Sequence, residues 1–520
     1  MENNYISTQI EYSAIQMILP LNLEKKIPED DVLHTFLRVM EGVNLKKYLP
    51  KRRGKGRNGY NPYMMLKIVL FAYMNRLHSL RSIEKAIQTD IRFMYLANEE
   101  RPSFKTIGEF ITSLQYDIHD IFIDINKRII ELDDDIKDQD TLYLDGTAYE
   151  ANANKFSFVW KKTAIKTLDK RIKEANSLLN TLSLLLEEYR LPVKEIHDSN
   201  TLDVYITKLK EIINDVGIDF VYGKGHRKNN LQRYYDKLVK LNNDIKSCEE
   251  KIRICGEDRN SYSKTDQDAT FMHMKYDYYN NTGVFKPGYN LQCAITDEYV
   301  TEIYVSNHRS DSKTLPHIIN RYMSSYGVIP TNLVADAGYG SYDNYMYLLD
   351  HNINAYVKYN TYLKEKRSKG NTYDSSNFIF KDGRYICPNG EELFFEKEVY
   401  DDREHYLKIT QHFRCHSCTN CKNKKECTKS DIGRTIQKNY VLDELRDNAK
   451  ELLDSEKGIE YRKKRSIYSE GVFGILKQDY EYIRLHRRGK LKTELELTLV
   501  IIGFNINKLH NKLNRPKVLN

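Results

Sequence analysis

Long apolar segments are absent from this sequence of 520 residues. The apolar runs LKIVLFAYM (66–74) and LTLVIIGFNI (497–506) are much shorter than the roughly 20 residues that a membrane-spanning helix requires. No positively charged segment leads into an apolar stretch at the N-terminus, so we expect no secretory signal. The sequence therefore predicts a cytosolic protein without a membrane partner.

Tryptophan is nearly absent as well, because Trp160 is the only one in the chain. It ends an extended, polar segment, ANANKFSFVW (151–160). An aromatic ring here could stack on a nucleic-acid base. A buried structural role is commoner for tryptophan, and we predict that role for Trp160.

Cysteine is scarce and unevenly placed, since five of the eight cysteines lie in residues 387–427. They occur as CPNG from Cys387 and as CHSCTNCKNKKEC from Cys415 to Cys427. Paired cysteines two residues apart, with a distant Cys-Pro-x-Gly turn, have the spacing of a structural zinc site. Disulfides are not expected in a cytosolic protein. Zinc needs four ligands, and His412 and His416 are also nearby; the alternative is a group of reduced thiols from a degenerate site.

Acidic side chains do not balance the basic ones, since 81 − 73 gives a formal charge of +8. The excess is concentrated in KKYLPKRRGKGR (46–57), YRKKR (461–465) and RLHRRGKLK (484–492). Such clusters are typical of a phosphate-backbone partner, although each could be a solvated surface. The length allows roughly three domains, and 40% apolar residues suffice for a core.

Residues 1–135 have the pattern of a helical region. Asp30-Asp31 can cap a helix through VLHTFLRVM, and Pro62 can begin a long apolar helix. The following periodic segment is interrupted at 98–102, which indicates two or three short helices. Short helices after a basic segment suit helix-turn-helix binding to DNA, and a plain helical bundle fits the pattern equally well.

Three acids stand out by their positions. Asp145 follows Leu142-Tyr143-Leu144 with a turn expected at Gly146, and Asp336 follows the apolar run 333–335, so both should lie at strand ends. Glu470 shares a predicted helix face with Lys477. Carboxylates from two strands and a helix could bind divalent metal ions for phosphoryl transfer. Taken singly, an Asp after a strand is more often a turn or cap residue, and a Glu and a Lys on one helix face are more often a solvated surface. Asp266, Asp268 and Asp311 are competing acids in polar, turn-like runs.

Two apolar heptad patterns, from Ile165 to Tyr189 and from Leu231 to Cys255, predict an antiparallel helical hairpin joined by a loop. Cys248 and Cys255 should be packing residues on it. Alternating apolar residues in 289–305, broken at Thr296-Asp297-Glu298, predict a strand hairpin with Cys293 in the core. A helix from Ser312, the Asp336 strand and a strand in 354–360 should follow. The C-terminal apolar segment should form a helix over one face of the sheet.

The stretches LDGTAYEANANKFSFVWKK, VADAGYGSYDNY and YRKKRSIYSEGVFGILK resemble the three acidic motifs of bacterial insertion-sequence DDE transposases, and those of insertion-sequence family 1182 in particular. TDQDATFMHMK with KPGYNLQCAITDEYVTEIYVSNHRSD resembles that family's central strands, and residues 58–110 resemble its N-terminal helical domain. Related proteins carry a Tyr-Arg-Glu-Lys signature, matched here by Tyr461, Arg465, Glu470 and Lys477. The Glu–Lys spacing agrees, whereas each of the two upstream gaps is one residue longer in this chain.

The resemblance implies a mixed α/β fold with a ribonuclease H-like catalytic core made from residues 136–160, 261–360 and 441–515. Residues 1–135 would form the helical DNA-binding domain. Residues 161–260 would be a helical-hairpin (coiled-coil) insertion, and residues 361–440 a Cys-rich insertion. Similar proteins favour Cys387, Cys418, Cys421 and Cys427 as the zinc ligands, with Cys415 the extra cysteine.

The resemblance also implies a function, namely cutting an insertion sequence from DNA and transferring its strands by metal-dependent hydrolysis and transesterification. Asp145, Asp336 and Glu470 would hold Mg²⁺ or Mn²⁺, while Lys477, Arg465 and Tyr461 would contact DNA phosphate. The partners would be double-stranded DNA, as end repeats and target, and further copies in a homodimer or higher assembly, with the protein associated with the nucleoid. Two alternatives remain: a ribonuclease H-like nuclease without strand transfer, and a transposase-derived DNA-binding protein without catalysis.

Overall fold

The computed structural model describes residues 23, 26–49, 59–136, 138–223, 227–274, 283–363 and 372–515. The chain divides into two compact units. One combines the residues up to Asp134 with those from Leu499 onward, and the other runs from Asp135 to Thr498. We call them the N-terminal unit and the central unit. The part of the basic cluster in residues 50–58 lies outside the described residues. None of the described helices has the length and hydropathy needed to cross a membrane.

The N-terminal unit is helical, as predicted. It contains α1 (Val32–Glu41), η2 (Leu45–Tyr48), α2 (Pro62–Met74), α3 (Leu80–Thr89), α4 (Ile91–Leu96), α5 (Phe104–Ser113) and α6 (Ile118–Leu132). The Asp31 carboxylate accepts the Leu33 N–H at 2.8 Å and caps α1, and Pro62 is the first residue of α2. The break between α4 and α5 falls where the sequence indicated it. The cap at Asp31, the helix start at Pro62 and the break are therefore confirmed.

The last helix, α17 (Lys490–Leu513), differs from its prediction. We expected it to cover the sheet, but its residues from Leu499 onward pack within the N-terminal unit. There, the Asn505 side chain donates to the Asn126 side chain at 2.8 Å, and Lys512 pairs with Asp133 at 3.0 Å. Gly503 has no side chain where α17 meets the backbone of Met74. Apolar periodicity reports that a face is buried, but not which element buries it.

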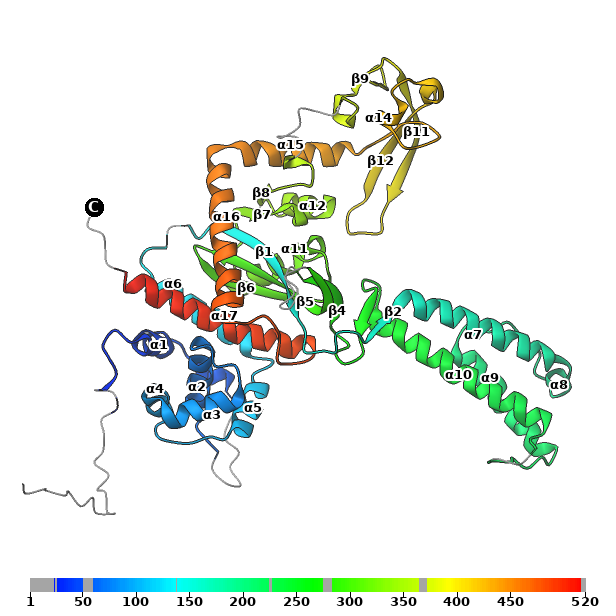
Figure 1. Ribbon diagram of the computed structural model, residues 1–520, viewed down its shortest axis with the longest axis horizontal. Coiled ribbons are helices and arrows are strands. Elements are labelled where there is room, and N and C mark those ends of the chain that lie inside the picture. Colours follow the sequence, from blue (N-terminus) through cyan, green and yellow to red (C-terminus); the bar gives the residue numbers. More distant parts are fainter. Residues whose placement is uncertain are drawn as a thin grey trace, which may run out of the picture. The chain divides into compact units, whose positions relative to one another are not determined.

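The central unit is built on a six-stranded sheet (Figure 1). Its strands are β1 (Thr141–Glu150), β4 (Thr270–Met274), β5 (Val284–Thr296), β6 (Tyr299–Ser306), β7 (Asn332–Ala335) and β8 (Asn354–Val357). The long strand β5 pairs antiparallel with β1 on one side and with β4 and β6 on the other. Strands β1, β7 and β8 are parallel neighbours. The chain is thus mixed α/β, as predicted.

The β5–β6 hairpin confirms the sequence prediction. Its two turn residues, Asp297 and Glu298, have φ angles of 43° and 77°, which suits a tight hairpin turn. Cys293 is fully buried on β5. The turn expected at Gly146 is wrong, because β1 continues through it and Gly146 pairs with Gln292.

Helices cover both faces of this sheet (Figure 1). Apolar residues of β1 and β7, including Leu142 and Leu333, pack against α11 (Leu315–Tyr326) and α12 (Tyr342–Asp350), and α15 (Tyr440–Asp454) joins the same core. On the opposite face, the Tyr143 ring meets those of Tyr461 and Tyr468 on α16 (Glu456–Gly474). Successive β1 residues alternate between the two faces, so the odd-numbered ones lie toward α16.

Residues 161–260 contain α7 (Lys161–Thr181), α8 (Ser183–Glu188), α9 (Ser199–Asp215) and α10 (Asn230–Cys255). The two predicted seams lie on α7–α8 and on α10. The connection is not only a loop, because α9 contributes Leu202, Leu209 and Ile212 to the shared core. Cys248 and Cys255 are buried, as predicted. Trp160, at the end of the short strand β2 (Phe158–Trp160), is 42% exposed, so its prediction as a buried residue is wrong.

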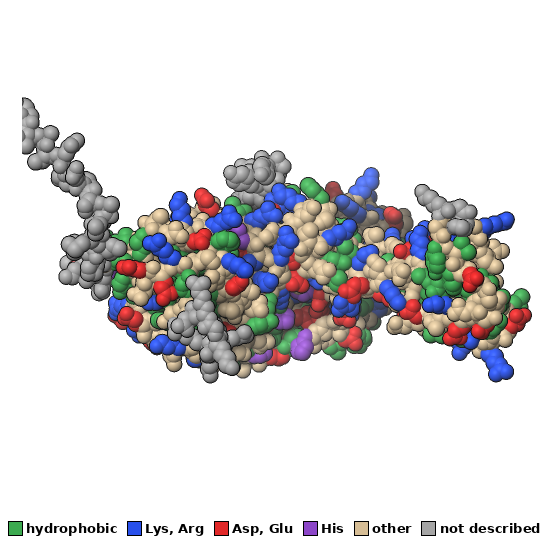
Figure 2. Space-filling view, turned by 90° about the horizontal axis from the view of Figure 1, so that it is seen from below, with side chains coloured by type: hydrophobic (Ala, Val, Ile, Leu, Met, Phe, Trp, Pro, Cys, Tyr) green, Lys and Arg blue, Asp and Glu red, His purple; other side chains and the backbone are tan. Residues whose placement is uncertain are grey.

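The Cys-rich region forms its own antiparallel sheet in the order β13-β12-β11-β10-β9. Its elements are β9 (Ile379–Lys381), β10 (Arg384–Ile386), β11 (Glu392–Asp401), β12 (Lys408–Cys415), η6 (Ser417–Asn420), α14 (Lys424–Cys427) and β13 (Thr435–Lys438). Cys415 and Cys418 are part of its small core, with Phe413 and Leu393. Charged residues of both signs are intermixed over the molecular face shown in Figure 2.

We expect Gly503→Ala to destabilise the N-terminal unit by about 1–3 kcal/mol. A Cβ at this position would lie 2.7 Å from Cα of Met74, and backbone cannot move aside as a side-chain tip can. Thermal unfolding and hydrogen exchange in α2 measure the change. Gly471→Ala is the matched control, because a Cβ there meets nothing within 4 Å and should stabilise α16 by roughly 0.5–1 kcal/mol. Equal effects of the two variants would contradict the proposed close packing.

Candidate active site

The parallel pairing of β1 and β7 brings two predicted acids together. Tyr143 is the register partner of Val334, so Asp145 and Asp336 follow at equal distance along their strands. Both alternate onto the α16 face of the sheet. Asp145 lies within β1, opposite Cys293 of β5, while Asp336 directly follows β7 and accepts the Gly338 N–H at 2.8 Å. Burial raises the pKa of Asp145 most strongly, and the nearby charge of Asp336 adds to that effect.

Helix α16 covers this acid pair with residues spaced one turn apart. The Tyr461 hydroxyl lies 3.1 Å from the Thr141 hydroxyl, and Arg465 Nη1 lies 3.2 Å from a carboxylate oxygen of Asp145. The buried Ser469 also faces Asp145. Tyr461 is only 4% exposed, so its ring packs against the sheet and not toward solvent. Arg465 is therefore the signature residue that directly contacts a strand acid.

Opposing effects set the ionisation of Asp145. Burial raises the pKa of this carboxyl most strongly, the positive charge of Arg465 lowers it, and Asp336 raises it again; the net shift is upward. A cation that approaches this carboxyl would stabilise its ionised form, because opposite charge favours the carboxylate over the neutral acid. The pair Asp145–Asp336 is thus a site where positive charge is stabilised.

Glu470 and Lys477 lie differently from their prediction. The α-helix ends at Gly474, and Ile475–Asp479 form a π-helical turn. That wider turn breaks the seven-residue spacing that would place Glu470 and Lys477 on one face. Glu470 is exposed, and within the described part of the chain no hydrogen bond or ion pair joins it to either strand acid. Lys477 Nζ instead donates to the Thr147 hydroxyl at 2.6 Å and to the Ala148 carbonyl at 3.0 Å.

Asp311, one of the competing acids, approaches the same part of the sheet from the other face. Its carboxylate accepts the side-chain amides of Asn290 and Gln292 at 2.7 and 2.8 Å. The buried Tyr339 hydroxyl donates to Gln292. The pKa of Tyr339 is raised, mainly by burial and next by the negative charge of Asp311. The signal in the sequence was the alternation of Asn290 and Gln292, which puts two amides on one face of a strand. An open cleft of about 680 Å³ lies here, lined by Asp311, Gly146, Gly338 and Phe285 among others.

The two other competing acids have structural partners. The Tyr289 hydroxyl donates to Asp266 at 2.9 Å, and Asp268 accepts the Lys490 N–H at 2.8 Å. Over the described residues, no three His, Cys, Asp or Glu side chains are arranged so that they could hold a metal ion. Two acids, Asp145 and Asp336, are brought together, and the third predicted acid, Glu470, is not.

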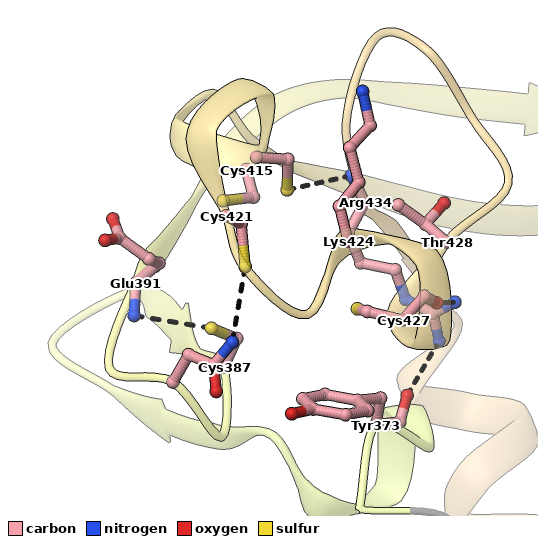
Figure 3. Close-up of a pocket in the computed structure, with 11 residues that line it drawn as sticks. Tyr373, Cys387, Glu391, Cys415, Cys421, Lys424, Cys427, Thr428 and Arg434 are labelled. Carbon is pink, nitrogen blue, oxygen red and sulfur yellow. Dashed lines mark hydrogen bonds between the residues drawn. The ribbon is translucent and has the colours of Figure 1, made fainter.

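The five cysteines of the Cys-rich sheet line a small cavity of about 20 Å³. Figure 3 shows the sulfur atoms of Cys387, Cys421 and Cys427 around this space, beside the Tyr373 ring. Three sulfurs accept hydrogen bonds at 3.3 Å: Cys387 from the Glu391 N–H, Cys418 from the Arg434 N–H and Cys421 from the Asn389 side chain. Burial and a hydrogen bond with Cys418 raise the pKa of Cys415 to about 12.

Comparison with known families gives two matches. A family model described as a transposase DDE domain matches residues 386–510, and one described as a transposase domain (DUF772) matches residues 21–113. The first includes α16, which covers the acid pair, and the second includes α1 to α5. Together they support an insertion-sequence DDE transposase, a DNA-cutting enzyme with a DNA substrate. Enzymes of this class generally use divalent metal ions such as Mg²⁺. No curated protein and no solved structure matches the chain.

Gly146→Ala should destabilise the central unit by about 1–3 kcal/mol. A Cβ there would lie 2.3 Å from the Gln292 amide nitrogen and 2.8 Å from Asp311 Oδ1. Gln292 is fully buried and held by Asp311 and Tyr339, so it cannot swing aside. Chemical unfolding measures the loss. Adding Gln292→Ala to Gly146→Ala should restore part of the lost stability, because the overlapping side chain is removed. If the losses of the two single variants simply add in the double variant, the steric overlap is contradicted.

Proposed function

We propose that this chain is the DDE transposase of an insertion sequence of the family 1182 type, which cuts element ends from DNA and joins them to a target. One observation carries the proposal. The parallel strands β1 and β7 bring Asp145 and Asp336 together beneath α16, and α16 lies in the segment matched by the transposase DDE domain. The narrower assignment to family 1182 rests on the sequence motifs alone.

The strand order supports a ribonuclease H-like core. In chain order the main strands are β1, β5, β6, β7 and β8, and in space they lie as β6-β5-β1-β7-β8, with β4 also against β5. Three antiparallel strands are thus followed by two parallel ones, as the resemblance predicts. The helical hairpin enters between β1 and β5, and the Cys-rich sheet enters between β8 and α15; we propose them as the insertions 161–260 and 361–440. The ends of the parallel strands are where such sheets place their chemistry.

The donor chemistry of the proposed site suits a hard divalent cation. Asp145, Asp336 and Glu470 would hold Mg²⁺ or Mn²⁺, and these ions, when bound, would neutralise charge on the phosphate and help to form the nucleophile. The raised pKa of Asp145 and the nearby Arg465 fit a site that awaits a cation. Glu470 follows Ser469, which already faces Asp145, so the end of α16 would have to turn by about 100° to bring Glu470 to the site.

The protein's own residues would orient the DNA. Arg465 lies at Asp145 and Lys477 lies two residues further along β1, where they would position phosphates close to the cleaved bond. The buried Tyr461 would support α16 and thereby the position of Arg465. The N-terminal helices would bind the end repeats, and a homodimer or higher assembly would hold two ends.

Two other functions make different predictions. A ribonuclease H-like nuclease would cut DNA and never join ends, and a DNA-binding descendant of a transposase would tolerate loss of the acids. The acid pair under α16, in which the pKa of Asp145 is raised, favours a catalytic site over the second alternative. A strand-transfer assay separates the transposase from the nuclease.

Asp145→Asn should abolish Mg²⁺-dependent nicking of the element's end sequence while leaving DNA binding unchanged. An amide keeps the size of the carboxylate but removes the charge that would attract the cation. Nicking and strand transfer are measured on labelled end repeats, and binding is measured by gel shift. Asp215→Asn, on exposed α9 surface, is the control and should retain activity. Unchanged nicking by Asp145→Asn would remove Asp145 from the site.

We further propose that Cys387, Cys418, Cys421 and Cys427 bind a structural Zn²⁺. Hydrogen bonds to the first three sulfurs favour thiolates. The pKa of Cys427 is raised by burial, and the neighbours that act on it include the other three cysteines of this set. Cys415, with its pKa near 12, suits a neutral packing residue. The side chains would have to rotate, because as they lie no three of them could hold a metal ion.

Purified protein should contain about one zinc per chain, measured by elemental analysis. Cys421→Ser should lose the metal and lower the unfolding temperature, because it removes one of four ligands. Cys415→Ser should keep the zinc. Loss of zinc from Cys415→Ser but not from Cys421→Ser would contradict this ligand set.

A further inference from the structure

Four basic residues from the C-terminal third contact β1 and its continuation in order. Arg465 pairs with Asp145 at 3.2 Å, and Lys477 Nζ donates to Thr147 at 2.6 Å. Arg484 Nε lies 3.5 Å from Glu150, and Arg488 Nε donates to the Asn152 carbonyl at 2.7 Å. We call Arg465, Lys477, Arg484 and Arg488 the β1 basic track. It begins at the acid pair and follows the strand away from it.

The far end of the track is held in a fixed shape by buried carboxylates. Glu496 is 1% exposed and accepts the backbone N–H groups of His486 and Arg487, each at 2.8 Å. Asp266, also buried, accepts the Gly489 N–H at 3.2 Å. These bonds occupy the backbone donors of residues 486, 487 and 489. The groups that this segment offers to an anion are therefore mainly its basic side chains.

Those side chains are presented to solvent. The side chains of Arg484 and His486 are 51% and 58% exposed, and Arg488 is exposed. Glu150, which Arg484 approaches, is already neutralised by Lys286 in a buried ion pair of 2.7 Å. Among the described residues, no acid forms an ion pair with Arg488. The end of the track therefore carries a surplus of positive charge on a rigid backbone.

We propose that the DNA strand bearing the cleaved phosphate runs along the β1 basic track, from the Asp145–Asp336 pair to Arg484 and Arg488. This proposal deepens the proposed function and rests on it. Seven residues separate Asp145 from Asn152, and at about 3.3 Å each they span roughly 23 Å. A duplex advances about 3.4 Å per base pair. Arg488 would thus meet a phosphate within about seven nucleotides of the cut.

The test measures binding of end-repeat DNA at several salt concentrations, with Ca²⁺ replacing Mg²⁺ to suppress cutting. Arg488→Gln keeps a donor for the Asn152 carbonyl but removes the charge. It should lower the slope of log affinity against log salt by about one. Arg488→Lys should keep the slope. Arg253→Ala is the control, since this arginine is 75% exposed on α10, and it should also keep the slope.

A scan with neutral methylphosphonate linkages locates the contact. With wild-type protein, a neutral linkage within about seven nucleotides of the cut should weaken binding, and with Arg488→Gln that position should become indifferent while others remain sensitive. An unchanged slope and profile in Arg488→Gln overturns the proposal. Asp145-dependent nicking would then still support the proposed function. Conversely, a shifted profile without any nicking would uphold the track and refute the transposase chemistry.

Discussion

The structure depends on the register between β1 and β7. With Tyr143 opposite Val334, the residues two places further along, Asp145 and Asp336, come to the same level and the same face of the sheet. A shift of one residue would turn one carboxylate toward α11 and α12, because side chains alternate across a strand. Buried neighbours fix the register: Leu142 and Leu333 point into one core, and Tyr143 packs under α16. The chemistry of the edge is thus set by packing on both faces.

Helix α16 couples that register to charge. Its side chains meet β1 at two successive levels, Tyr461 at Thr141 and Arg465 at Asp145. The contact between Tyr461 and Thr141 is buried, so it fixes the position of α16 along β1. Arg465 then lies close enough to Asp145 to pair with its carboxylate. The π-helical turn that follows redirects Lys477 to Thr147 and Ala148. A regular helix would have kept Lys477 above Glu470 and away from the strand.

Local signals predicted much of this. The cap at Asp31, the start at Pro62, the turn at Asp297-Glu298 and the acid after β7 each depend on a few adjacent residues. The predictions were wrong where the structure of a residue depends on a neighbour that is distant in the sequence. Gly146 was expected in a turn, yet it lies within β1 because Gln292 and Asp311 need the room. Trp160 packs against Phe271 yet remains partly exposed, and the π turn has no sequence signature of its own.

The distribution of charge follows from the same constraint. Three acids near β1 are buried and have polar partners. Glu150 pairs with Lys286, Glu496 accepts backbone N–H groups, and Asp266 accepts the Tyr289 hydroxyl. A buried carboxylate is tolerated only when such partners satisfy it. Burial raises the pKa of Glu496, but hydrogen bonds from His486, Tyr482 and the backbone outweigh that effect and lower it. Its stabilising contribution is therefore present above the ordinary glutamate pKa and is lost as the pH falls through the lowered value. These acids are buried, whereas the basic side chains of residues 484–488 include exposed ones such as Arg484 and Arg488. The surface at this segment is therefore positive although the net charge of the chain is modest.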